Sequence, residues 1–158
     1  MRKNLAYDDQ GRLLIDVRGP RFGAAITMTV LAVALVVQGP VGKALVIWQT
    51  FVFAVSTVFG LEWSIYGNVF RAIKRRFDLG PPPEVELEGP PRFAQACGLI
   101  VSVGALVAFG LGAELVGWIL VGVVLALSSL LALTGFCVGC ELYLLGQRMR
   151  SRSGAATA

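Results

Sequence analysis

The chain has 158 residues, of which 56% are hydrophobic and only 15% are charged, and its formal net charge is +4. Because a typical soluble domain has about 25% charged residues, this composition excludes an ordinary water-soluble globular protein. The mean hydropathy of +0.72 instead favours an integral membrane protein embedded in the lipid bilayer.

Mostly polar residues precede the first apolar run, and no small-x-small cleavage site follows that run, so no secretory signal peptide is expected. Helical segments of about 20 apolar residues are long enough to cross the hydrocarbon layer. Four runs qualify, at residues 22–38, 44–61, 93–111 and 115–133. Glycine-containing breaks at residues 39–43 and 110–114 separate the members of each pair. The sequence therefore predicts an all-α membrane protein with four transmembrane helices, arranged as two tandem helical hairpins.

The second helix of each hairpin is expected to continue into the membrane interface, as far as Phe70 in the first half and Leu145 in the second. Of the fourteen Lys and Arg residues, only Lys43 lies at a hairpin tip. The other thirteen flank the opposite ends of the spans, so the positive-inside rule predicts that both termini are cytoplasmic. These cations lack interleaved aromatic residues, which favours contact with anionic lipid and argues against nucleic-acid binding.

The two halves of the chain begin alike. Residues 15–22 read IDVRGPRF and residues 85–93 read VELEGPPRF, and each segment leads into an apolar run. We therefore predict one membrane domain over residues 1–158 with an internal repeat, 15–76 and 85–150. The alternating segments 14–18 and 85–88 are short and extended on the cytoplasmic side; they either pair as a small sheet, with Arg18 near Glu88, or remain separate loops. Residues 78–83 predict a stiff proline-rich linker, and residues 151–158 a disordered tail.

Near the end of the chain, residues 135–143 read GFCVGCELY, which places Cys137 and Cys140 in a C-x-x-C motif. Aligning Gly60 with Gly135 shows that the first half has no such cysteines. The distance from Glu114 to Cys137 is 23 residues, or about 34 Å of helix, so the pair is expected at the cytoplasmic boundary. Cys97, in the first turns of the third span, is expected in the same layer.

Three interpretations of the cysteines stay open. They form a thiol relay or sulfur carrier, a zinc or copper(I) site, or a small-residue packing face, since Gly135 and Gly139 make a G-x-x-x-G motif. The chain has no His, so a metal would need a carboxylate or water as its fourth ligand, and no metal or cofactor is predicted. A permanent disulfide is not expected in a reducing compartment. Reactivity depends on whether Gly135 breaks the last span, so that Cys137 caps a new helix, or the helix is continuous.

Polar residues within the spans are few. Glu62 is expected near the cytoplasmic interface, paired with Arg71 or Arg92, and is an auxiliary candidate for the site. Gln38, Gln49 and Glu114 are expected near the outer boundary. Nucleotide-binding motifs and His-based catalytic groups are absent from the sequence.

The two Arg-Phe starts, the paired apolar runs and the closing GFCVGCELYLLG together resemble a bacterial membrane family known as domain of unknown function 4395, over residues 15–148. A similar Cys-bearing end occurs in the small membrane domain attached to some rhodanese sulfurtransferases. The resemblance implies a bacterial inner-membrane protein whose Cys137 and Cys140 handle thiols or sulfur with a thioredoxin-like or sulfurtransferase partner.

The expected function is therefore thiol–disulfide or sulfane-sulfur exchange at the membrane, in which Cys137 attacks, Cys140 resolves and Cys97 is a third member. The alternative is a small non-catalytic subunit that packs against a larger membrane complex. The many small residues also fit a homo-oligomer.

Overall fold

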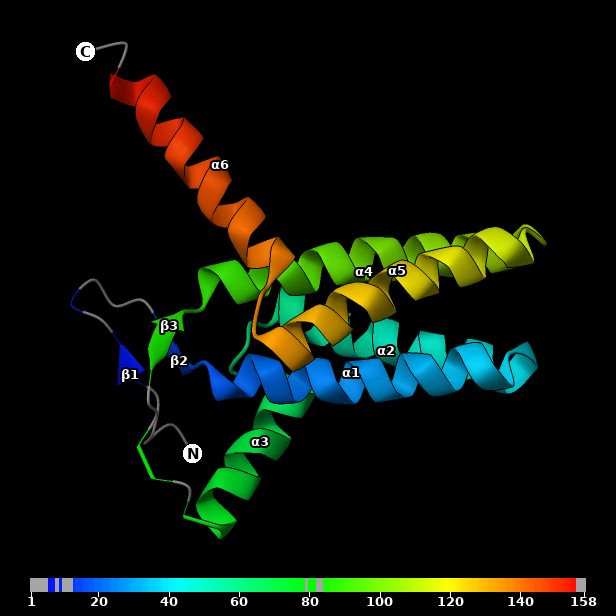
Figure 1. Ribbon diagram of the computed structural model, residues 1–158, viewed down its shortest axis with the longest axis horizontal. Coiled ribbons are helices and arrows are strands. Elements are labelled where there is room, and N and C mark those ends of the chain that lie inside the picture. Colours follow the sequence, from blue (N-terminus) through cyan, green and yellow to red (C-terminus); the bar gives the residue numbers. More distant parts are fainter. Residues whose placement is uncertain (1–5, 8, 10–12, 79, 82–83, 156–158) are drawn as a thin grey trace.

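The computed structural model describes residues 6–7, 9, 13–78, 80–81 and 84–155. In these residues the elements are β1 (Ala6–Tyr7), β2 (Leu13–Asp16), α1 (Arg18–Val37), α2 (Gly39–Val58), α3 (Ile65–Arg76), β3 (Val85–Leu87), α4 (Gly89–Gly110), α5 (Glu114–Thr134) and α6 (Val138–Ala155). Figure 1 shows α1, α2, α4 and α5 side by side as a bundle, with the strands, α3 and α6 gathered at one end of it.

The four bundle helices are long and apolar enough to cross a membrane, with lengths of 20, 20, 22 and 21 residues. This confirms the predicted number of spans. Large apolar side chains cover their outer faces; Val36, Ile100 and Leu115 are 85%, 71% and 73% exposed. Such a continuous apolar surface would promote aggregation in water, but it fits the hydrocarbon of a bilayer. The fold therefore indicates a multi-pass membrane protein.

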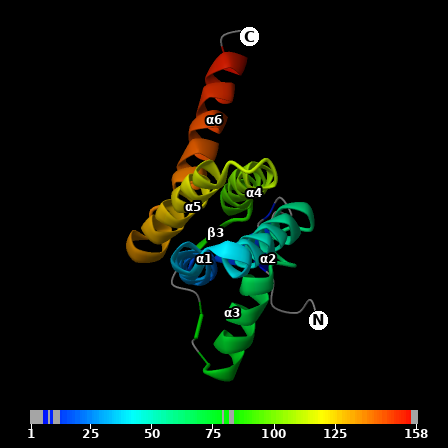
Figure 2. The same cartoon turned by 90° about the vertical axis from the view of Figure 1, so that its right-hand side faces the viewer.

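Neither α2 nor α5 continues as a single helix toward Phe70 or Leu145, so that prediction was wrong. Each helix ends close to a glycine with positive φ, which is Gly60 (+88°) after α2 and Gly135 (+79°) after α5. This backbone conformation favours glycine because it has no Cβ. The side chain of Ser64 then accepts a hydrogen bond from the Gly67 N–H at 3.3 Å and caps α3. As a result, α3 and α6 are separate helices that leave the bundle in roughly opposite directions, as Figure 2 shows.

The helix contacts come in matching pairs, one in each half of the chain. α1 packs on α2 as α4 packs on α5, α1 packs on α5 as α4 packs on α2, and α3 lies against α1 as α6 lies against α4. Equivalent ring pairs hold the last of these contacts, Phe22 with Phe70 at 5.6 Å and Phe93 with Tyr143 at 5.7 Å between centroids. The two halves therefore pack on each other through two matching helix contacts, α1 with α5 and α4 with α2.

The interior of the bundle is apolar, with one polar cluster. Its apolar core consists of Leu31, Ala34, Val46, Phe53, Ala105, Val121 and Val124. The sequence placed Gln49 near the outer boundary, but it is 0% exposed and lies in the middle of α2, because that helix begins already at Gly39. Its Nε2 donates to Thr27 Oγ1 at 3.0 Å, and its Oε1 accepts from the Tyr66 hydroxyl at 2.9 Å. These bonds satisfy polar groups that have no access to water.

At the end of the bundle that carries α3 and α6, β1, β2 and β3 form an antiparallel sheet in the order β1-β2-β3. Leu14 pairs with Leu87 and Asp16 with Val85, so the predicted pairing of the two extended segments is confirmed. The expected proximity of Arg18 to Glu88 was wrong, because the antiparallel register puts them beyond opposite ends of the paired strands. The side chain of Arg18 bonds Asp16 and the Pro81 carbonyl oxygen instead.

A further difference from the expectation lies at the C-terminal end. Residues 151–155 continue α6 as helix, where a disordered tail was expected, and residues 156–158 lie outside the described part. The helix continues there because no proline or helix-terminating glycine interrupts it before Gly154.

Candidate functional site

The two cysteines of the C-x-x-C motif are joined by a disulfide at the start of α6, with Cα atoms 5.2 Å apart. Cys137 immediately precedes the first residue of the helix, and its carbonyl oxygen accepts from the Glu141 N–H at 3.1 Å. Its Sγ accepts from the Cys140 N–H at 3.3 Å. Cys137 is therefore the N-cap of a new helix, which confirms the alternative in which Gly135 breaks the last span.

This position matters for the chemistry of the sulfur. Unpaired backbone N–H groups at a helix N-terminus carry partial positive charge, which favours a thiolate at the cap. Glu141, in the same first turn, acts in the opposite sense. The bonded pair is the oxidised member of a dithiol–disulfide couple, whose reduced form would have its Cys137 sulfur at the end of the helix.

One of the two residues between the cysteines, Gly139, allows α6 to pack closely against α4. A Cβ on Gly139 would lie 2.7 Å from the Cβ and 2.8 Å from the Cα of Ala94, and a Cβ on Gly89 would lie 2.9 Å from the Tyr143 hydroxyl oxygen. The packing role that the G-x-x-x-G spacing predicts is thus real for Gly139. It does not involve the sulfur atoms, so it leaves the reactive role of the cysteines open.

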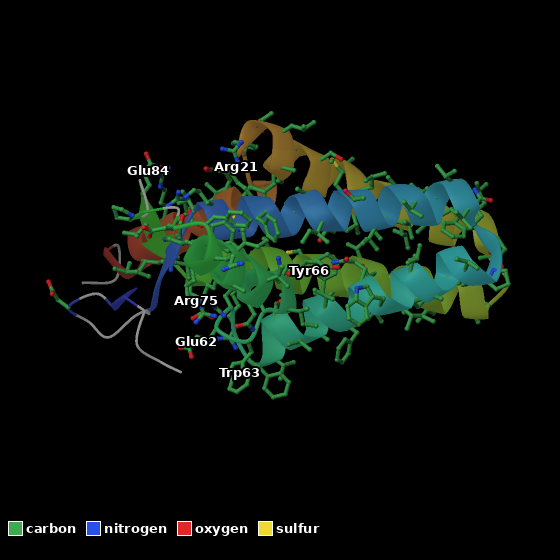
Figure 3. The ribbon with its side chains drawn as sticks, turned by 90° about the horizontal axis from the view of Figure 1, so that it is seen from below. Arg21, Glu62, Trp63, Tyr66, Arg75 and Glu84 are labelled. Atoms are coloured by element: carbon green, nitrogen blue, oxygen red, sulfur yellow. A yellow bond between two sulfur atoms is a disulfide. The ribbon has the colours of Figure 1, made fainter. Side chains whose placement is uncertain are left out.

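A cavity of about 460 Å³ lies beside the disulfide, between the strands and the ends of α1, α4, α5 and α6. Its polar and charged lining residues are Arg21, Glu84, Glu86, Gln95, Cys137, Cys140 and Glu141. In Figure 3, Arg21 and Glu84 lie on one side of the molecule, whereas Glu62, Trp63 and Arg75 lie on the other. The two cysteines line a partly open cavity that also has charged groups of both signs.

Within this cavity Glu86 is half-buried, and its burial raises the pKa of its carboxyl. In the part of the chain that the structure describes, the side chain of Glu86 makes no hydrogen bond or ion pair. Arg21 is held at the rim, where its Nη2 donates to the Ala132 carbonyl oxygen at 3.5 Å and its guanidinium lies beside Gly135. Sequence reasoning missed Glu86, although its place in the alternating segment before the second Arg-Phe start was visible.

Cys97 is a free, half-buried thiol on α4, and it does not line the cavity beside the disulfide. Among the residues described, no group of three His, Cys, Asp or Glu side chains is arranged to hold a metal ion. The structure therefore does not assemble the three cysteines into a ligand set.

Glu62 lies in the turn between α2 and α3, on the other side of the bundle. Its carbonyl oxygen accepts from Arg71 Nη2, which also donates to Asn68 Oδ1 at 2.7 Å. Burial lowers the pKa of the Arg71 guanidinium, and the charge of Glu62 opposes that shift. Arg71 thus bonds the backbone of Glu62 and lies within the influence of its charge, whereas Glu62 does not line the cavity beside the disulfide.

Arg92, the other expected partner of Glu62, has a different role. Its Nε and Nη2 donate to the carbonyl oxygens of Thr57 and Val58 at 3.0 and 3.2 Å, at the C-terminal end of α2. Arg21, which follows the equivalent Gly-Pro in the first half, donates in the same way to the end of α5. The signal in the sequence was the repeated Arg-Phe, but only the packing reveals that each arginine caps a helix of the other half.

The comparisons with known proteins give one result. The sequence profile of a family described as domain of unknown function (DUF4395) matches residues 15–148. No curated protein and no solved structure matches the chain.

Proposed function

The chain belongs to the DUF4395 family, and we propose that it is a membrane partner for thiol–disulfide or sulfane-sulfur exchange. The reacting group is the pair Cys137 and Cys140. One observation carries the proposal: the disulfide caps the N-terminus of a helix and lines a cavity with charged groups. Purely structural cysteines in a membrane helix need neither feature.

The proposal includes a topology in the bacterial inner membrane. Two tandem hairpins cross the bilayer, both termini and the sheet are cytoplasmic, and the disulfide faces soluble partners. The distribution of positive charge supports this topology. Arg71, Lys74, Arg75 and Arg76 on α3 and Arg148 on α6 belong to the end of the bundle with the sheet, whereas Lys43 lies at the other end, bonded to Glu114. Positive charge is retained on the cytoplasmic side.

The exchange proceeds through a mixed disulfide. A thiolate of a reduced dithiol protein attacks Cys137 Sγ, the bond between Cys137 and Cys140 breaks, and Cys140 leaves as a thiolate that takes up a proton. The partner's second thiolate then attacks its own sulfur in the mixed disulfide and releases Cys137. The partner loses two electrons and two protons, and the cysteine pair gains them. With the pair reduced, the Cys137 thiolate can instead accept a sulfane sulfur from a protein persulfide, which leaves as a thiolate.

Alkylation of the reduced, full-length protein in nanodiscs tests the proposal. At neutral pH we expect Cys137 to be labelled faster than a free cysteine peptide, and Cys97, in the same molecule, to be labelled more slowly. In a Cys140→Ser variant, Cys137 is first activated as its mixed disulfide with thionitrobenzoate. A dithiol protein with its resolving cysteine replaced should then attack Cys137, release thionitrobenzoate as a thiolate and form a stable mixed disulfide. Labelling of Cys137 no faster than that of the free peptide would overturn the proposal.

The double variant Cys137→Ser/Cys140→Ser separates this function from the accessory-subunit alternative. If the protein exchanges thiols, the variant folds and inserts normally but loses the mixed disulfide. Loss of assembly with a larger complex, without a change in thiol chemistry, would favour the accessory role. Reporter fusions at the two ends test the topology, and a periplasmic location of either end would contradict it.

A further inference from the structure

We propose that Glu86 is the proton donor and acceptor for the Cys140 sulfur during exchange, through the cavity that both residues line. The inference rests on the proposed thiol exchange and names the group that handles its proton. Cys140 leaves as a thiolate when the disulfide opens, and it must lose a proton when the disulfide forms again. A neighbouring carboxyl group that can both give and take a proton can serve both steps.

The geometry comes from three parts of the fold. Glu86 is on β3, whose pairing with β2 fixes it opposite Ile15. The first turn of α6, held on α4 by the close approach of Gly139 to Ala94, carries Cys140. The cavity of about 460 Å³ connects the two and exceeds the roughly 30 Å³ that one water molecule occupies in the liquid. A proton can therefore pass between the carboxyl and the sulfur along water.

The other charged groups that face this cavity are already committed or differently placed. They are Arg21 on α1, Glu84 before β3, and Glu141 on α6. Arg21 donates to a carbonyl at the end of α5, Glu84 is exposed, and Glu141 lies in the first turn of α6, where the helix N-terminus stabilises its negative charge. Glu86 alone among the described carboxylates of the cavity combines burial with a raised pKa.

The proton balance is as follows. When a partner thiolate opens the disulfide, Glu86 gives its proton to the Cys140 thiolate and becomes a carboxylate, which is protonated again from the solvent. In the reverse direction the carboxylate takes the Cys140 proton, and the resulting thiolate attacks Cys137 Sγ in the mixed disulfide. The bond between Cys137 and the partner breaks, and the partner leaves as a thiolate. Each bond change is thus paired with the transfer of one proton, and the electrons go to or come from the partner dithiol.

The first experiment measures the reduction of the full-length protein in nanodiscs by dithiothreitol between pH 5 and 9, with each rate divided by the thiolate fraction of the reagent. For the native protein this normalised rate should fall as pH rises through the pKa of Glu86. Glu86→Gln cannot donate a proton, so its profile should be flat and lower by on the order of 10²-fold at the acidic end. Glu84→Gln, which changes a carboxylate of the same cavity, should keep the native profile, and Glu86→Asp should recover part of it.

The second experiment does not require any exchange. In a Cys137→Ser variant, the rate of alkylation of Cys140 against pH should show two inflections, one for the thiol and one for Glu86, and adding Glu86→Gln should leave one. Two unchanged inflections, or an unchanged fall in the first experiment, would overturn the role of Glu86. If instead Cys137 in the native protein reacts no faster than a free peptide while the second experiment succeeds, the exchange function fails and the coupling between Glu86 and Cys140 stands.

Discussion

A methyl group on residue 139 would separate the helix that carries the disulfide from the bundle. In Gly139→Ala the new Cβ would lie 2.7 Å from the Cβ of Ala94, whereas carbon atoms in contact are about 3.5–4.0 Å apart. The start of α6 must therefore move by about 1 Å. The new Cβ would also lie 2.8 Å from the Cα of Ala94. Because both neighbouring atoms are held by the backbone of α4, no flexible side chain can move to relieve the clash.

The magnitude follows from two opposing effects. Overpacking of this kind costs about 1–3 kcal/mol, and alanine stabilises a helix by up to about 1 kcal/mol relative to glycine. We expect a net loss of about 1–2 kcal/mol, which lowers the unfolding midpoint by about 2–8 °C for a domain of this size. Gly146→Ala on the same helix is the matched control, because a Cβ there meets nothing within 4 Å. It should leave the midpoint unchanged or raise it slightly.

Thermal unfolding of the two variants in the same detergent measures this difference. Adding Ala94→Gly to Gly139→Ala should restore only part of the midpoint, because it removes the Ala94 methyl group but leaves the Ala94 Cα at 2.8 Å. Gly139→Ala should also slow the reduction of the disulfide more than Gly146→Ala does, since it moves the cap of α6. Equal midpoints for Gly139→Ala and Gly146→Ala would mean that α6 does not pack on α4 at residue 139. The position of the disulfide would then not be fixed by this contact.

Three further predictions concern the polar contacts. Gln49→Leu should destabilise the protein by about 1–3 kcal/mol, because it leaves buried partners without hydrogen bonds. Thr50→Val, whose hydroxyl bonds the Val46 carbonyl of its own helix, should cost under about 1 kcal/mol. The free energy of unfolding in detergent compares the two variants. A double-mutant cycle with Lys43→Gln and Glu114→Gln should give a coupling of about 0.2–1 kcal/mol that declines with salt, because both side chains are partly exposed. Hydrogen bonds from neighbouring cations outweigh burial and lower the pKa of the Asp16 carboxyl, so the stabilisation lost in Asp16→Asn should be constant above about pH 5 and disappear as the pH falls below 3.8; a difference that grows in acid would contradict this.

The sequence predicted the parts of the fold that depend on composition and period. Four spans followed from four apolar runs, and the pairing of β2 with β3 was one of the two alternatives that the alternating segments left open. The strand register could not be predicted, because an alternating segment of four residues fits either direction. For that reason Arg18 was expected near Glu88, while the antiparallel pairing moved them apart.

The depth of Gln49 and the breaks before α3 and α6 depend on backbone choices that composition does not reveal. Gly60 and Gly135 were aligned from the sequence, but an apolar run that contains a glycine can continue as helix or end there. Gly135 decided the character of the candidate site, since a continuous helix would have left Cys137 without a cap. Glu86 was missed for a related reason, because a carboxylate in a strand becomes informative only when its burial is known.

The two halves also differ at the turns that follow α2 and α5, and the cavity with the cysteines lies beside the second of these turns. After α2, the Glu88 carboxylate accepts from the Leu61 N–H at 2.7 Å and lies against Gly60, so a side chain of the second half fills the turn. The residue aligned with Glu88 is Arg18, which bonds Asp16 and the Pro81 carbonyl instead.

At the equivalent turn after α5, the Phe136 N–H bonds its neighbour Thr134 at 3.1 Å and the Arg21 guanidinium lies beside Gly135, but no carboxylate enters the turn as Glu88 does after α2. Space remains beside Gly135, and the cysteines and Glu86 line it. The two repeats thus differ at one aligned position, Glu88 in the second half and Arg18 in the first. The turn after α2 is filled by the Glu88 carboxylate, whereas the turn after α5 has no such carboxylate. If so, Arg18→Glu should allow a carboxylate to approach the second turn, and it should slow alkylation of Cys137 more than Arg18→Gln does. Equal rates for these two variants would show that the cavity has another cause.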